Sequence, residues 1–292
     1  MTEAQGPTGS RPSRASPAVP RSAPYWALLR ARYQLMLQYR AAAMAGAVTQ
    51  LFWGFVRIMI LLAFYRSSDA TPPMAFADVV TYIWLGQALL ALLPWNHDLE
   101  LEAFIREGNV AYELLRPIDL YAAWSMRTVA TRIASTSLRA IPIVLIAGLA
   151  IPLLGFPEWS LAPPDSFAAA VAFGAAMVVA LALGCAISML VHVSLLWTIS
   201  GDGMAKTMPA LVTVFSGMVI PLPLFPDWAQ PVLGVLPFRA LVDVPYRIYA
   251  GDIPISAAPF EIGLGAAWAV VLIALGRAWL ERGKRVLVVQ GG

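Results

Sequence analysis

The chain has 292 residues, of which 59% are hydrophobic and only 13% are charged. Soluble domains are nearer half apolar and a quarter charged, so this excess predicts a polytopic membrane protein and excludes a single soluble core. The net charge of +3 comes from basic residues spread between hydrophobic runs, which excludes a nucleic-acid-binding face. The single cysteine, Cys185, lies inside an apolar run and has no partner for an intrachain disulfide.

The N-terminal segment, residues 1–24, is rich in Pro, Ser, Gly and Arg and contains no apolar run. This composition predicts a disordered cytoplasmic tail, because a signal peptide needs an apolar run of about 7–15 residues. Residues 25–40 then predict a helix that carries aromatic and basic side chains, which is typical of a helix at the membrane interface. A plain cytoplasmic extension of the first span is the alternative.

From residue 25 to residue 292 the hydropathy pattern predicts one all-α membrane domain with six spans, because about 20 apolar residues cross a bilayer core of about 30 Å. The predicted spans cover residues 41–65, 76–95, 122–154, 167–191, 207–224 and 255–280. With the N-terminus inside, sixteen of the twenty Lys and Arg residues lie on the inner side and three lie outside. This asymmetry predicts that both termini are cytoplasmic.

A charged stretch, residues 105–124, separates predicted spans two and three. Pro117 stops any helix through it, and Gly108 permits a turn that other residues resist. Just before it stand Asn96, His97, Asp98 and two glutamates, a group that resembles a metal or acid–base site. It lacks the His and Glu spacing of such sites, so we interpret it as the acidic start of a helix.

Polar side chains recur at helical spacing along predicted span three, and Arg57 is the one charge deep in span one. A charge in mid-bilayer costs at least about 2.5–3.5 kcal/mol, so such residues face protein or a water-filled path. The candidate path residues are Arg57, Arg132, Ser135, Thr136 and Arg139. Two alternatives stay open: the span-three arginines reach the inner headgroups, and Arg57 reaches the outer headgroups or pairs with Asp78 or Glu261.

Prolines interrupt the outer segment before span six, residues 225–254, although short pieces of it are apolar enough to enter a membrane. Broken helices survive at that depth only where protein or water satisfies the freed backbone groups. We therefore expect a re-entrant pair of short helices, with a surface loop as the alternative. The candidate hairpin residues are Pro221, Pro226, Trp228, Pro237, Phe238 and Pro245.

No phosphate-cradling loop occurs, because the only Gly–Lys pair, Gly283–Lys284, continues into Arg285. We therefore expect no catalytic residue, bound cofactor or metal in this chain. A membrane-embedded lipid-modifying enzyme and a secondary transporter remain as alternative functions. The sequence does not identify a substrate, although the scarcity of charges in the spans favours amphiphilic or hydrophobic cargo.

Two motifs carry a resemblance to a known family: GNVAYELLRPID at residues 108–119, and the proline-rich run at residues 216–251. Together they resemble the membrane subunit of ABC transporters of the type-2 permease family, in its bacterial branch with paired permeases and a separate ATPase. The resemblance extends from residue 25 onward. It implies six spans, an interfacial helix before the first, a coupling helix between spans two and three, and a re-entrant hairpin before span six.

The function that this resemblance implies is that of a permease subunit of an ATP-driven exporter in the bacterial inner membrane. ATP and Mg²⁺ would bind a separate cytoplasmic ATPase, present in two copies. A second permease chain of different sequence is favoured, with a homodimer as the alternative. The implied ATPase-coupling residues are Arg106, Glu107, Gly108, Tyr112, Glu113, Arg116 and Asp119.

Overall fold

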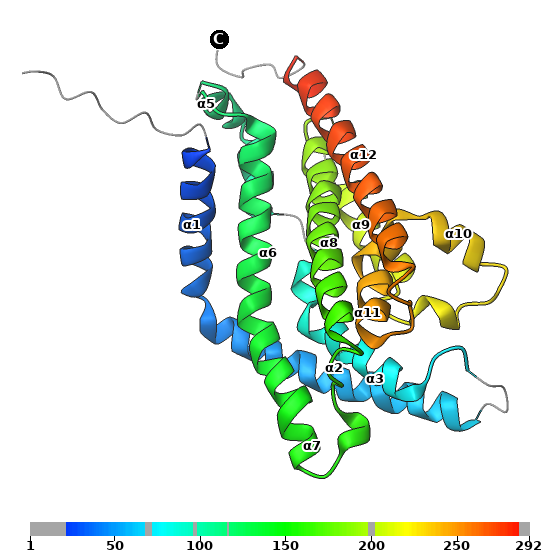
Figure 1. Ribbon diagram of the computed structural model, residues 1–292. Helices are drawn as coiled ribbons and strands as arrows, with labels where there is room; N and C mark the ends of the chain where they lie inside the picture. The colour runs from blue at the N-terminus through cyan, green and yellow to red at the C-terminus, as the bar shows by residue number, and fades with distance from the viewer. Residues whose placement is uncertain (1–21, 68–71, 96–97, 116, 198–201, 286–292) are drawn as a thin grey trace, which may run out of the picture.

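The computed structural model describes residues 22–67, 72–95, 98–115, 117–197 and 202–285. Every regular element in these ranges is helical, which confirms the predicted all-α class (Figure 1). Most of the predicted N-terminal tail, up to residue 21, lies outside the described residues, and so do His97 and Arg116.

The α-helices follow in chain order, and they are joined by short 3₁₀ segments and one π-helical turn. The α-helices are α1 Ala23–Leu37, α2 Arg40–Ser67, α3 Phe76–Ala88, α4 Leu99–Arg106, α5 Val110–Leu114, α6 Leu120–Leu145, α7 Ile151–Leu153, α8 Phe167–Ser194, α9 Asp202–Phe215, α10 Gln230–Val235, α11 Asp243–Ala250 and α12 Ala258–Lys284. The shorter segments are η1 Leu90–Leu92, the π-helical turn η2 Ile146–Ala150, η3 Pro157–Trp159, η4 Leu222–Leu224 and η5 Pro237–Leu241.

Four helical stretches in the described ranges are long and apolar enough to cross a membrane. They are Arg40–Ser67, Leu120–Leu153, Phe167–Ser194 and Ala258–Lys284, and they match predicted spans one, three, four and six to within a few residues. The second of them joins α6, η2 and α7. Pro142 lies inside α6 and cannot donate the usual backbone hydrogen bond, and the π-helical turn follows it one turn later.

The other two predicted spans correspond to shorter helices. Helix α3 has 13 residues and α9 has 14, so each is about 20 Å long, against about 30 Å for a bilayer core. Helix α3 ends at Ala88 and continues as η1, whereas α9 ends before Gly217, whose φ of +86° turns the chain. The six-span count therefore stays a prediction.

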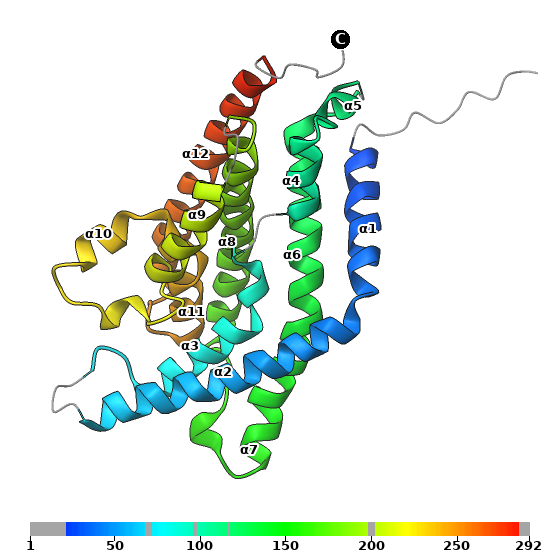
Figure 2. The same cartoon turned by 180° about the vertical axis from the view of Figure 1, so that it is seen from behind.

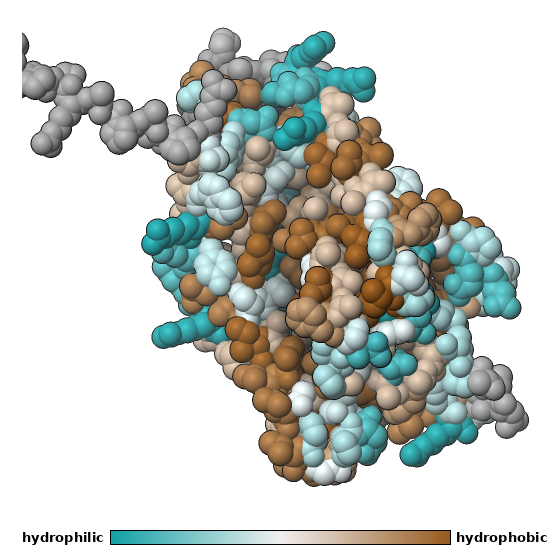
Figure 3. Space-filling view, viewed as in Figure 1, coloured by the Kyte–Doolittle hydropathy of each residue, from teal (hydrophilic) through white to brown (hydrophobic). Residues whose placement is uncertain are grey.

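Figures 1 and 2 show α6, α8 and α12 running side by side, with α8 in the middle, while α1 lies along α6 and α2 crosses below. The start of α1, helix α5 and the end of α12 lie at the same end of the molecule. Figure 3 shows hydrophilic side chains at that end and along both edges of the view, and hydrophobic ones over much of the middle of the face below it.

Helix α3 lies at the centre of the bundle, because every residue from 79 to 88 is buried. Trp84 is fully buried, and its indole N–H donates to the carbonyl of Trp159 at 2.7 Å. The α3 sequence is mostly apolar and is buried on all sides from residue 79 onward, which is the pattern of a helix enclosed by other helices. This central position brings the end of η1 against α6 and α8, where the polar groups of span three lie.

Candidate coupling and translocation sites

The turn between α4 and α5 holds most of the predicted coupling residues. Helix α4 begins where the Asp98 carboxylate accepts hydrogen bonds from the backbone N–H groups of Glu100 (3.0 Å) and Leu101 (3.2 Å). This is an N-cap, so the acidic stretch starts a helix as the sequence predicted. Gly108 has φ +74°, a left-handed conformation that favours glycine, and it turns the chain from α4 into α5.

Exposed side chains cover the outer face of this turn. Arg106, Glu107 and Gly108 are exposed, and Arg106 pairs with Glu102 at 2.6 Å. The aromatic ring of Tyr112 is on the same short segment, with an exposed fraction of 70%, and Leu115 follows with 83%. An apolar surface next to charged groups is thus present at the hydrophilic end of the molecule.

Two other predicted coupling residues hold the turn in place. The Glu113 carboxylate accepts a hydrogen bond of 2.7 Å from the Trp124 indole, which ties α5 to α6. Asp119 caps α6 by accepting from the Ala122 backbone N–H at 2.6 Å, and its own N–H donates to the Tyr25 hydroxyl at 2.9 Å. Arg116, the remaining predicted coupling residue, lies outside the described residues.

An ion-pair network joins α4 to the two helices beside it, and its basic members were not among the sequence candidates. Arg32 of α1 contacts Glu100 at 2.6 Å and Asp98 at 3.7 Å. Arg127 of α6 contacts the same two carboxylates at 3.0 and 3.6 Å. The acidic residues between positions 98 and 102 are the sequence feature that points to basic partners. The spacing of residues along the chain did not identify Arg32 and Arg127 as those partners.

Arg132 is buried, with an exposed fraction of 6%, where η1 ends against α6 and α8. Its guanidinium donates to the carbonyls of Leu92 (2.6 Å) and Leu93, and to the Ser188 hydroxyl at 2.6 Å. Carbonyls at a helix end have no partner within the helix, so Arg132 supplies the donors that the break after η1 requires.

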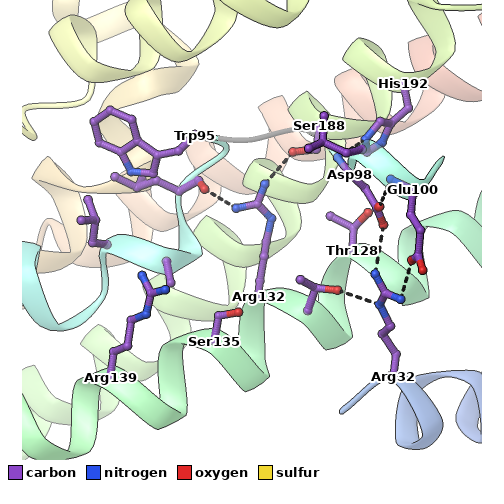
Figure 4. A pocket seen from close by; sticks show the side chains of 15 residues that line it. Arg32, Trp95, Asp98, Glu100, Thr128, Arg132, Ser135, Arg139, Ser188 and His192 are labelled. Carbon is purple, nitrogen blue, oxygen red and sulfur yellow. Dashed lines mark hydrogen bonds and ion pairs between the residues drawn. The ribbon is translucent and has the colours of Figure 1, made fainter. Parts of the chain in front are cut away.

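The other polar residues of span three have different surroundings. Ser135 and Arg139 line a cleft of about 530 Å³ between α1, α6, α8 and residues 90–95 and 98–100, which we call the α6 cleft (Figure 4). Thr136 is buried, and its hydroxyl has no hydrogen-bond partner among the described residues. The structure therefore brings Arg132, Ser135 and Arg139 to one cleft, and Thr136 does not line it.

Arg57 lies apart from that cleft, at the turn that follows α9. Three consecutive backbone carbonyls of this turn each accept one hydrogen bond. The sequence pattern did not predict these contacts. The donors are the Asp243 backbone N–H to Ser216 (3.1 Å), the Tyr82 hydroxyl to Gly217 (3.0 Å) and the Arg57 guanidinium to Met218 (2.9 Å). Of the two acids proposed for Arg57, Glu261 pairs with Arg239 at 3.1 Å.

The proline-rich segment before α12 consists of short helical pieces. Pro237 begins η5, Phe238 stacks on Phe215 with ring centroids 6.1 Å apart, and Pro245 is buried within α11. Pro221 begins the turn into η4, Pro226 precedes α10, and Trp228 is 80% exposed.

Asp243, at the start of α11, is the buried acid that anchors this segment. Its carboxylate accepts from the Leu222 N–H at 3.3 Å and from Arg247 at 3.2 Å. Burial raises the pKa of the Asp243 carboxyl, and the positive charges of Arg247 and Arg239 oppose that rise.

Within the described ranges, no cluster of three His, Cys, Asp or Glu residues is placed to hold a metal ion. The buried polar groups described above bind backbone carbonyls and other side chains. Long apolar helices, a short buried central helix and an exposed turn at the hydrophilic end define a polytopic helical membrane protein.

Residues 51–291 match the family model described as "ABC-2 family transporter protein". The chain therefore belongs to the ABC-2 transporter family, and it is a membrane component, or permease, of an ABC transporter, which confirms the resemblance seen in the sequence. No curated protein and no solved structure matches it.

Proposed function

We propose that the chain is the permease subunit of an ATP-driven exporter and that the turn from α4 to α5 docks on a separate cytoplasmic ATPase. The observation that carries this proposal is an exposed surface on a firmly held turn. Tyr112 and Leu115 face outward, while Glu113 ties the turn to α6. A soluble partner that binds this surface therefore contacts the end of a long helix through fixed hydrogen bonds.

Motion of the turn would reach two further helices. The carboxylates of Asp98 and Glu100 pair with Arg32 of α1 and Arg127 of α6, so α4 cannot shift without moving or breaking these contacts. Binding energy at the turn drives transport only where it differs between the inward and outward states. ATP and Mg²⁺ belong, in this proposal, to the ATPase, which is present in two copies.

The proposed membrane arrangement has six spans, with α3–η1 and α9 as the two short ones. Irregular backbone at membrane depth requires internal hydrogen bonds. Arg132 supplies them after η1, and Arg57 and Tyr82 supply them after α9. In this arrangement α1 lies at the inner interface, and the pieces from α10 to α11 form the re-entrant hairpin at the outer side.

The proposed assembly contains a second permease chain, of different sequence or identical, in a bacterial inner membrane with both termini in the cytoplasm. Family membership favours this function over a lipid-modifying enzyme or a secondary transporter. One six-span chain has few helices with which to enclose a path, which supports a paired permease.

Two double variants, one that reverses charges and one that removes apolar side chains, test the docking surface. Arg106→Glu combined with Glu107→Arg, or Tyr112→Ala combined with Leu115→Ala, should leave membrane insertion intact because these side chains are exposed at the hydrophilic end. Both pairs should weaken co-purification of the ATPase or uncouple ATP hydrolysis from export. Arg30→Glu, on the exposed face of α1, is the control. Unchanged assembly, ATPase stimulation and export in both double variants would refute the proposed docking surface.

A further inference from the structure

The α6 cleft has two halves of different character, as Figure 4 shows. In one half, Arg32 lies against Asp98 and Glu100, and its charge is matched by theirs. In the other half, Arg139 and Trp95 point toward the same space, and no acidic side chain lies between them in Figure 4. The second half is therefore basic and rich in donors.

Arg139 differs from Arg132, seven residues earlier on the same helix. Arg132 binds two carbonyls and a hydroxyl, so its donors are largely engaged. The Arg139 guanidinium makes no hydrogen bond or ion pair with the described residues, and its Nε atom is buried. Arg139 is half-buried, so its guanidinium can donate to an anion that enters the cleft.

Further donors face the same space. The indole N–H of Trp95 is buried and has no acceptor among the described residues, and the Ser135 side chain lies between Arg132 and Arg139. The carboxylates of the cleft are both engaged, because Arg127 contacts them as well as Arg32. Three arginines and two carboxylates line the cleft, so an incoming anion meets a net positive charge.

The place of Arg139 in the fold points to an amphiphile. Its guanidinium packs against Gly46, where an added Cβ would lie 3.1 Å from the guanidinium carbon. Two turns after Gly46, on the same face of α2, the apolar ring of Trp53 is exposed (53%). A polar group bound at Arg139 therefore lies next to a surface that suits acyl chains.

From this arrangement we propose that the α6 cleft binds the anionic headgroup, a phosphate or carboxylate, of a membrane amphiphile, with Arg139 as its main ligand. The guanidinium fork matches both groups bidentately, and Trp95 and Ser135 add neutral donors. A volume of about 530 Å³ admits such a headgroup. The inference goes beyond the proposed function, because binding requires neither ATP nor an ATPase.

Thermal unfolding of the purified full-length protein in an uncharged detergent tests the site. Phosphatidylglycerol should raise the unfolding temperature, whereas diacylglycerol with the same chains should raise it less, because it lacks the anion. Arg139→Gln should weaken the response by about tenfold in lipid concentration, since one charge-assisted contact is lost. Arg139→Lys should keep part of it, and Arg30→Gln, which removes an exposed charge, should keep all of it.

A second measurement with inorganic phosphate distinguishes a lipid headgroup from a free anion as the ligand. Stabilisation by phosphate alone, lost in Arg139→Gln, would support the anion site and assign it to a free anion. An equal response to phosphatidylglycerol and diacylglycerol, or a full response in Arg139→Gln, would overturn the proposal. Should Arg139→Gln fail to fold, Trp95→Phe takes its place, because it keeps an aromatic ring and removes one donor. This variant should weaken the response to phosphatidylglycerol and leave the response to diacylglycerol as it is. An unchanged response to phosphatidylglycerol would overturn the proposal.

Discussion

Arg132 shows how a single side chain allows the central helix to stop inside the bundle. The carbonyls of Leu92 and Leu93 lie at the end of η1, and the Arg132 guanidinium donates to both while also binding Ser188. The Leu93 carbonyl accepts in addition from the Trp95 backbone N–H at 2.9 Å. Gly184, one turn before Ser188 on α8, lets that helix approach, because an added Cβ there would lie 3.2 Å from the Leu92 carbonyl oxygen. The break after η1 is thus built from α6 and α8 together.

Replacing Arg132 with Met should destabilise the protein strongly. A buried acceptor left without a donor costs about 1–3 kcal/mol, and the Leu92 carbonyl loses its donor, whereas the Leu93 carbonyl keeps the Trp95 N–H. Ser188→Ala removes only one of the three contacts and should cost about 1 kcal/mol. Thermal unfolding in detergent measures both variants, and an Arg132→Met midpoint equal to that of the wild type would show that the arginine is not the cap described here.

Gly54 should tolerate no side chain. A Cβ at this position would lie 2.6 Å from the ring of Trp84, and that ring is held by its hydrogen bond to Trp159. Gly54→Ala should therefore destabilise by about 1–3 kcal/mol through overpacking. Gly174→Ala is the matched control, because nothing lies within 4 Å of an added Cβ there. The same midpoint for both variants would contradict the close crossing of α2 and α3.

At the residue scale, local sequence predicted some roles and missed others. Asp98 as the start of a helix was readable, because a cap depends on residues two or three positions away. The role of Arg132 was not, because its acceptors lie 39, 40 and 56 residues away in the chain. Helical spacing grouped Arg132 with Arg139, and both line the α6 cleft, yet Arg132 binds three protein acceptors and Arg139 binds none among the described residues.

At the scale of elements, the length of a helix depends on partners that hydropathy does not show. Residues 76–95 are mostly apolar and predict one span, but α3 ends at Ala88 and η1 ends at Leu92, where Arg132 donates to the terminal carbonyls. Likewise, α1 lies along α6 through contacts of Arg32 with Thr131 (3.5 Å) and of Tyr33 with Ser137 (3.4 Å). Neither contact has a signal in the sequence around α1.

The turn after α9 should loosen when its donors are removed. Arg57→Leu frees the Met218 carbonyl and Tyr82→Phe frees that of Gly217, at about 0.5–3 kcal/mol each. Hydrogen exchange of residues 216–224 should accelerate in both variants and most in the double variant. Exchange at α12 is the internal control and should stay unchanged. Unaltered exchange of the turn in the double variant would mean that these two side chains do not hold it.

At the scale of the whole molecule, the fold places distant parts of the chain at one end. The start of α1, the turn from α4 to α5 and the end of α12 lie together, and hydrophilic side chains gather there (Figures 1 and 3). The count of basic residues predicted one side for these segments. The structure adds that the segments meet in one region, which charge counting alone does not show.

A labelling experiment tests on which side of the membrane that end lies. In a Cys185→Ala background, which removes the native buried thiol, single cysteines replace Gly108, Glu281 or Asp227. An impermeant maleimide added to intact cells should label Asp227→Cys, because this residue precedes α10 in the proposed outer hairpin. Gly108→Cys and Glu281→Cys should stay unlabelled, because both residues lie in elements at the end that we assign to the cytoplasm.

Permeabilised cells provide the control, since all three cysteines are at exposed positions and should then react. Reaction of Gly108→Cys together with Glu281→Cys in intact cells would place the hydrophilic end outside and invert the orientation. Reaction of only one of the two would contradict the shared end itself, because elements at one end of a membrane protein face the same compartment. Protection of Asp227→Cys until permeabilisation would place the proline-rich segment inside, and the outer re-entrant hairpin would then be wrong.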